Sequence, residues 1–105
     1  MAYDLVVGKS SLVKDSPTVV AEIDFSEYPI VCALAEKTGS SFLHEVSNIF
    51  QDQSFGVNDL ELAREQLFSM LYQDLNSNEK TFAFKMIAVV CFAIHKKQSL
   101  FGVAD

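Results

Sequence analysis

Gly8, Lys9 and Ser10 are the residues of this chain whose types and spacing most closely match a catalytic motif. They follow an apolar run, as the end of a phosphate-binding loop does when a strand leads into a nucleotide site. That loop also needs a glycine five residues before Gly8, where the chain has Tyr3. Residues 11–17 are polar and end in proline, which disfavours a helix that could direct its N-terminus at a phosphate. We therefore expect a strand ending in a turn, without a nucleotide.

Residues 74–78 place oxygen ligands at the first, third and fifth positions of a possible calcium loop. Such a loop needs glycine at its sixth position and a bidentate carboxylate at its twelfth. The chain has Glu79 and Lys85 at these two positions. We therefore expect a connection between two helices that is rich in capping residues.

Two cysteines and two histidines could supply either a zinc site or a nucleophile with its base. Cys91 and His95 are four residues apart, as two ligands on one helical face would be, and only Cys32 and His44 could complete the set. No C-x-x-C or H-x-x-x-H pair supports a metal site. Both cysteines lie among apolar neighbours, whereas a reactive thiolate needs an electropositive, partly exposed position. We expect no metal, no cofactor and no enzymatic activity.

The acidic side chains are distributed unevenly, which is the more informative feature. Between Asp15 and Glu79 there are twelve acidic and two basic residues, a net charge of −10, whereas the flanking residues carry +4. A surface of one sign would attract a basic protein and repel nucleic acid. An acidic surface that serves solubility alone remains the alternative. The expected partner contacts are Glu22, Asp24 and Glu27 in first place and Asp59, Glu61 and Glu65 in second place.

Length and composition set the class of protein that must carry these acids. The 105 residues correspond to a single domain, 1–105, and the 50% of hydrophobic residues exclude a disordered chain. The apolar stretch from Phe82 to Ile94 contains Lys85 and is shorter than the about 20 residues of a membrane span. Two cysteines without a signal peptide favour a cytoplasmic protein with reduced thiols.

Alternating side chains in the N-terminal quarter of the chain predict two antiparallel strands, Tyr3–Val7 and Thr18–Phe25. Four apolar residues of the second strand share the face expected to point to the core: Val19, Ala21, Ile23 and Phe25. Val20, Glu22 and Asp24 share the other face, so two of the expected contacts should point to solvent. Because a two-stranded sheet is marginal alone, its apolar face should rest on helices.

Four helices are expected after the strands, at residues 30–37, 42–50, 58–76 and 79–97. Their expected boundary residues are Ser26, Pro29 and Gly39 for the first helix, Asn58 with Glu61 for the third, and Ser77 or Asn78 for the last. The last helix is apolar on nearly every side and should be central and buried. Its expected core residues are Ile87, Val90, Cys91 and Ile94. The fold class is therefore α+β, with a small two-stranded antiparallel sheet near the N-terminus packed against about four helices.

A small, acidic, motif-free α+β chain that opens with residues 1–10, MAYDLVVGKS, resembles the immunity proteins of bacterial contact-dependent growth inhibition systems. These proteins share no invariant functional residues, so the resemblance implies a role and no site. The implied role is to bind and neutralise a cognate toxin, with a basic nuclease and above all a ribonuclease as the expected toxin. No direct nucleic acid, membrane or small-molecule partner is expected. A cytoplasmic adaptor or regulatory module is the alternative, followed by an enzyme whose site the sequence does not show.

Overall fold

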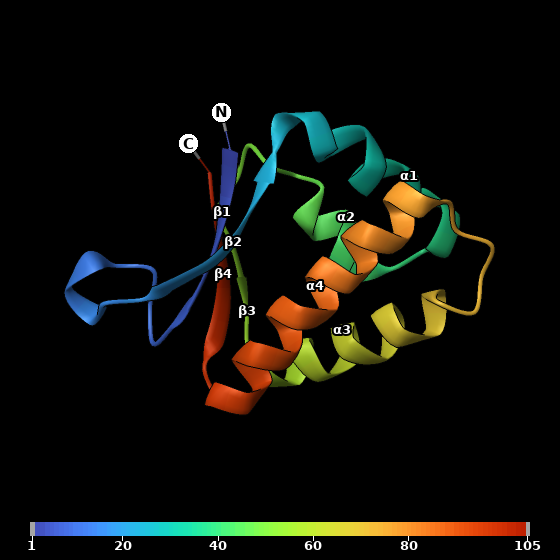
Figure 1. The fold of residues 1–105 in the computed structure, drawn as a ribbon. Helices are drawn as coiled ribbons and strands as arrows, with labels where there is room; N and C mark the ends of the chain where they lie inside the picture. The colour runs from blue at the N-terminus through green and yellow to red at the C-terminus, as the bar shows by residue number, and fades with distance from the viewer. Residues whose placement is uncertain (1, 105) are drawn as a thin grey trace.

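Four antiparallel strands and four helices make up the fold, an α+β architecture (Figure 1). The structure is a computed structural model that describes residues 2–104, so Met1 and Asp105 lie outside the description. The strands are β1 (Ala2–Gly8), β2 (Thr18–Asp24), β3 (Gln53–Phe55) and β4 (Ser99–Val103), arranged in the order β2-β1-β4-β3. The helices are α1 (Tyr28–Thr38), α2 (Ser41–Val46), α3 (Val57–Met70) and α4 (Ser77–Lys96). Short 3₁₀ turns cover Val13–Asp15 and Phe25–Glu27.

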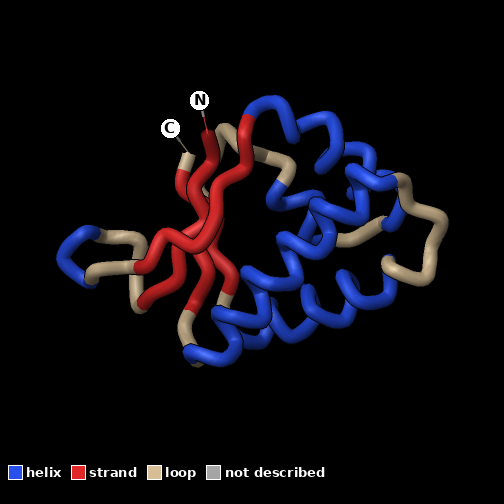
Figure 2. Tube along the Cα trace, in the orientation of Figure 1, coloured by secondary structure: helices blue, strands red, loops and turns tan. Residues whose placement is uncertain are grey.

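The α+β class is confirmed, but the prediction of a two-stranded sheet is wrong. The strand β4 pairs with the free edge of β1, and the three-residue strand β3 pairs with β4 in turn. In β4, Leu100 is fully buried while Phe101 lies on the opposite face and is partly exposed. The four α-helices lie against one face of this sheet (Figure 2), and the helical turn on the other side belongs to the β1–β2 connection. The opposite face, which we call the open face, is therefore not covered by an α-helix of residues 2–104.

A β-bulge in β2 changes which of its side chains face the helices. Leu5 lies opposite Ala21 and Val6 lies opposite Val19, so Val20 is the extra residue. Ile23 is fully buried as predicted, whereas Val19 is turned to the open face and is 63% exposed. The expectation that Val19 belongs to the core is therefore wrong. The extra residue shifts the strand by one position, so the side chains before Val20 point to the opposite face from the one that simple alternation predicts.

The first two helices begin and end partly where predicted. Pro29 lies in the first turn of α1, and Gly39 ends it with a left-handed φ of 69°. The predicted cap at Ser26 is wrong, because residues 25–27 form a 3₁₀ turn that leads into α1. Ser40 caps α2 by accepting from Leu43 N, and the helix ends at Val46 instead of continuing through residue 50.

The third and fourth helices begin earlier than predicted, and the third also ends earlier. Gly56 N donates to Asp59 Oδ2 at 3.1 Å, so α3 begins before the predicted cap at Asn58, and it ends at Met70 instead of near residue 76. Asn76, and neither Ser77 nor Asn78, caps α4 by accepting from the main-chain nitrogen of Glu79.

The helix α4 contacts α1, α3, β1 and β4, which confirms its central position. Its buried apolar residues are Phe82, Ala83, Met86, Val89, Val90 and Ala93. Of the four residues expected in the core, only Val90 is fully buried, and Ile87, Cys91 and Ile94 are half-buried. The buried face is thus rotated from the predicted one, and Phe84 is left 56% exposed.

A buried carboxylate ties the end of α1 to the start of α4. Glu79 is 4% exposed, and its Oε1 lies 2.9 Å from Lys37 Nζ and accepts from Asn76 N. Lys37 Nζ also donates to the main-chain oxygen of Asp74. The ion pair with Lys37, followed by the hydrogen bond from Asn76, holds the pKa of Glu79 below its ordinary value of 4.5. The polar residues 74–78, between α3 and α4, thus cap α4, as expected for a connection between two helices.

Glu79→Gln should destabilise the protein at neutral pH and have a smaller effect in acid. A carboxyl whose pKa is lowered by folding contributes stability above its unfolded pKa, and this contribution is lost as the pH falls through the folded pKa. The difference in urea midpoint between wild type and variant should therefore shrink as the pH falls below 4.5, the ordinary pKa of a glutamate side chain. Lys37→Gln breaks the same ion pair from the other side and should show the same trend. A difference that is unchanged from neutral to strongly acid pH would contradict the assignment.

Candidate functional site

The Gly8-Lys9-Ser10 segment forms the predicted strand end and turn. Gly8 is the last residue of β1, and the connection after it is closed by its own hydrogen bonds. Ser10 Oγ donates to Asp15 and accepts from Leu12 N at 3.1 Å. The segment that follows is a three-residue 3₁₀ turn, so no helix N-terminus is directed at this loop.

The cysteines and histidines lie on three different helices and do not form a cluster. Cys32 is half-buried on α1, and Cys91 is half-buried on α4. The Cys32 thiol raises the pKa of Tyr28, chiefly through a side-chain hydrogen bond. Among residues 2–104, no three His, Cys, Asp or Glu side chains come close enough to hold a metal ion. The same residues contain no helix with the length and hydropathy needed to cross a membrane.

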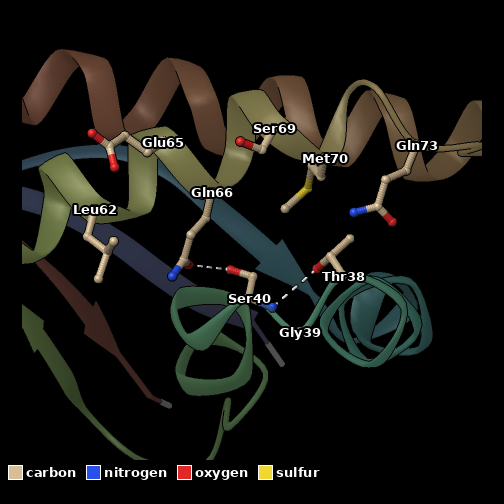
Figure 3. Close-up of a pocket in the computed structure, with 9 residues that line it drawn as sticks. All are labelled: Thr38, Gly39, Ser40, Leu62, Glu65, Gln66, Ser69, Met70 and Gln73. Carbon is tan, nitrogen blue, oxygen red and sulfur yellow. Dashed lines mark hydrogen bonds between the residues drawn. The ribbon is translucent and has the colours of Figure 1, made fainter.

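A cavity of about 300 Å³ separates the α1–α2 turn from α3 (Figure 3). Its polar groups bond to one another: Ser40 Oγ donates to Gln66 Oε1 at 2.8 Å, and Gln66 Nε2 donates to Ser41 Oγ at 3.1 Å. Glu65 is the one ionisable residue in its lining. Glu65 and the hydroxyls of Thr38, Ser40 and Ser69 line the cavity, and the bonds between Ser40, Ser41 and Gln66 have a structural role, because they join α2 to α3.

The two predicted sets of contact acids lie far apart in the sheet order. Glu22 and Asp24 are exposed on the edge strand β2, whereas Glu61 and Glu65 are exposed on α3, which contacts the other edge strand, β3, and its neighbour β4. Asp59 already accepts the hydrogen bond that begins α3. The two sets therefore belong to different parts of the surface, one on β2 and the other on α3.

Glu27, the third acid of the first set, is occupied within the fold. Its Oε1 lies 3.0 Å from Lys85 Nζ and accepts from Asp24 N. Lys85 also donates to the main-chain oxygen of Glu22, so this lysine secures the edge of β2 from the helical side. Glu27 is thus a structural residue, and the acids of this set that are free to meet a partner are Glu22 and Asp24.

Asp4 joins the two free acids, and it is the residue that sequence reasoning missed. The antiparallel register places Asp4 directly opposite Glu22, and paired residues share a face. Asp24 lies two residues beyond Glu22 on that same open face. In the part of the chain that the structure describes, none of the three carboxylates forms an ion pair. Like charges directly opposite one another destabilise a sheet, so this end of the open face, which we call the acidic end, is electrostatically unsatisfied.

The acidic end borders an apolar area of the open face. A cavity of about 380 Å³ extends from Asp4 to the β1–β2 connection. Its apolar lining consists of Val6, Val13, Pro17, Val19 and Val103. Val13 is 90% exposed and Val19 is 63% exposed. An exposed apolar area bordered by charged residues is typical of a protein-binding surface.

Lysines gather at the opposite end of the strands. Gly8 pairs with Ser99, which places Lys9, just after β1, near Lys96 and Lys97, just before β4. All three lysines are exposed. On the sheet, Asp4, Glu22 and Asp24 thus lie at one end of the strands, and these three lysines lie at the other.

No family model, curated protein or solved structure matches the chain. The features of the surface that bear on function are the carboxylates of the acidic end and the exposed apolar residues beside them.

Proposed function

We propose that this chain is a protein-binding module that recognises a basic partner through the open face of its sheet, and that it acts as an immunity protein. The observation that supports this proposal most directly is the Asp4–Glu22 pair, in which two carboxylates lie opposite one another and form no ion pair with any of residues 2–104. A lysine or arginine placed between them would relieve their repulsion on binding. The repulsion between the two carboxylates, which destabilises the free protein, is thus removed in the complex.

The apolar area beside the pair would contribute the remaining part of the affinity. Charge complementarity mainly accelerates encounter and excludes wrong partners, whereas buried apolar contacts hold a complex together. Val13 and Val19 are well exposed and can be covered by a partner. A partner that presents basic residues beside an apolar area would match both the acidic end and the apolar area of the open face.

A nuclease toxin has the required chemistry, because an enzyme that binds nucleic acid presents lysine and arginine to the phosphates. The resemblance to immunity proteins favours such a toxin, and a ribonuclease in particular. In this role the chain acts in the cytoplasm, needs no cofactor and catalyses no reaction. A cellular adaptor would use the same surface with a different partner, so the identity of the partner separates the two functions.

The direct test is to express the chain in cells together with the toxin domain encoded beside its gene, and to count survivors. We expect survival with the wild-type chain and a stable complex of the two purified proteins. Death at the same rate with and without the chain, together with no complex in solution, would refute the immunity role and leave the adaptor role.

Glu22→Lys should stabilise the fold and weaken the complex. The substitution turns a repulsive cross-strand pair into an attractive one, which should raise the free energy of unfolding by about 0.2–1 kcal/mol. The same change places a positive charge against a basic partner, and we expect the dissociation constant to rise at least about tenfold. Denaturant unfolding and calorimetric titration with the toxin domain measure the two effects.

Glu61→Lys is the matched control, because it makes the same change in net charge on an exposed position of α3. It should leave the dissociation constant within about threefold, as expected for a charge outside the contact. If Glu61→Lys weakens the complex and Glu22→Lys does not, the partner binds the α3 acids and the open face is not the contact.

A further inference from the structure

Three aromatic side chains contact one another where β2 leads into α1. The rings of Phe25 and Tyr28 are stacked, with centroids 6.2 Å apart and planes 9° apart. The ring of Phe50 lies 6.5 Å from that of Tyr28 and is tilted by 59°. Phe25 is 54% exposed and Phe50 is 59% exposed. Tyr28 lies half-buried between them. These three residues, which we call the aromatic cluster, are thus joined through Tyr28 and leave the rings of Phe25 and Phe50 open to solvent.

The aromatic cluster differs from the other exposed rings of the chain. Phe68, Tyr72 and Phe84 are also exposed, but within residues 2–104 none of them has an aromatic neighbour. Single exposed apolar residues are ordinary, whereas a contiguous group marks a contact surface. Aromatic residues are also enriched among the few residues that dominate binding free energy.

One free carboxylate lies beside the aromatic cluster in the chain, because Glu27 of the same turn is already paired with Lys85. Asp24 directly precedes Phe25 in the chain and belongs to the acidic end. Burial and then the charges of Asp52, which follows Phe50 by two residues, and Glu45 raise the pKa of Tyr3 to about 12. Tyr3 is the strand partner of Ile23, the residue before Asp24, so these acids flank the same end of the sheet.

We propose that the aromatic cluster is an arginine-binding site, where a guanidinium group of the partner stacks on an exposed ring and donates to Asp24. This inference rests on the proposed function and names the side chain that the surface selects. Arginine fits better than lysine because its planar group can stack on a ring and still direct N–H groups to a carboxylate. Lysine carries a compact, strongly hydrated charge that gains less from an aromatic face.

The test uses two synthetic peptides that differ only in their basic residue, acetyl-Gly-Arg-Gly-Arg-Gly-amide and its lysine counterpart. Titration is followed by the backbone amide resonances of the ¹⁵N-labelled chain. We expect the arginine peptide to bind about two- to fivefold more tightly, the factor that a surface cation–π contact provides. The largest shifts should fall on Phe25, Tyr28 and Phe50.

Phe25→Leu and Phe50→Leu keep an apolar side chain and remove the aromatic face, so each should reduce the preference for arginine. Phe68→Leu is the control, because Phe68 is also an exposed phenylalanine, with 45% of its surface accessible, but lies on α3 outside the aromatic cluster. Equal affinity of the wild-type chain for both peptides, or an equal effect of Phe68→Leu, would overturn the proposal. Circular dichroism of each variant verifies that the fold is retained.

The two proposals fail in distinguishable ways. If Glu22→Lys weakens binding of both peptides and the leucine variants change nothing, the acidic end stands and the arginine site is refuted. If the arginine preference depends on the aromatic cluster but the chain does not protect cells from the toxin, the arginine site stands and the immunity role is refuted.

Discussion

Gly102→Ala should destabilise the protein by about 3 kcal/mol, the upper part of the range for overpacked cores. Gly102 lies in β4 opposite Leu5, on the face of the sheet that the helices cover. A Cβ atom there would overlap the ring and hydroxyl of Tyr3, far inside van der Waals contact. Tyr3 is 1% exposed, so its ring cannot move aside into solvent. Urea unfolding of the purified variant measures the loss.

A double-mutant cycle with Tyr3 tests the cause of that loss. Tyr3→Leu removes the ring, so Gly102→Ala should cost much less in the Tyr3→Leu background than in the wild type. We expect a coupling free energy between the two substitutions of about 0.5–3 kcal/mol, the range for residues in contact. Tyr3→Phe removes only the hydroxyl, which is buried without a hydrogen-bond partner among residues 2–104 and is the atom nearest to the added Cβ. Because the ring atoms would still overlap that Cβ, Tyr3→Phe should relieve a smaller part of the cost than Tyr3→Leu does. Additive effects of Tyr3→Leu and Gly102→Ala would show that the strain arises elsewhere.

Phe82→Ala should destabilise the protein by about 3–5 kcal/mol, the usual range for truncating a buried phenylalanine. Phe82 is 2% exposed on the buried face of α4, so the substitution removes a large apolar surface and leaves a cavity. This loss is a large part of the about 5–15 kcal/mol that stabilises a small domain. The denaturant midpoint should fall steeply while the slope of the transition stays constant.

Phe84→Ala is the matched control in the same helix. Phe84 is 56% exposed, and its truncation should cost less than about 1 kcal/mol, because surface substitutions rarely cost more. Similar losses for the two variants would mean that the buried face of α4 is not the one described.

The sequence predicts β1 and β2 well because each is long enough to show alternation. It fails for β3, which has three residues, and for β4, whose five residues follow a helix that is apolar almost throughout. It also misplaces Val19, because nothing local to β2 indicates that the register with β1 shifts between Leu5 and Val6. The two C-terminal pairings and the register of β2 both depend on contacts between segments that are distant in the sequence. A pattern within one segment therefore does not reveal them.

The helix boundaries show a related limit. Asn76, Ser77 and Asn78 are all good capping residues, and their order alone does not select one. The choice of Asn76 follows from Glu79, which sits at the third helical position and is held there by Lys37 from α1. The tertiary ion pair therefore fixes a boundary that capping preferences leave open.

For the candidate site, strand alternation correctly turns Glu22 and Asp24 outward. Asp4 occupies the corresponding outward position of β1, and its alternation with Tyr3 and Leu5 could have revealed it. What the sequence could not provide is the register that sets Asp4 opposite Glu22. The contact of Phe50 with Tyr28 likewise joins segments that only the folded chain brings together.

The central place of β4 has a consequence for how the protein folds as it is made. During translation β1 and β2 leave the ribosome first, but the second edge of β1 stays unpaired until residues 99–103 follow. At the ~5–20 residues per second of synthesis, this interval lasts several seconds. Through that time a nascent chain presents the apolar side chains of Leu5 and Val7 beside an open strand edge, the kind of segment that chaperones bind. The sheet can therefore close only after β4 has left the exit tunnel, so vectorial synthesis makes the last strand the one that completes the fold.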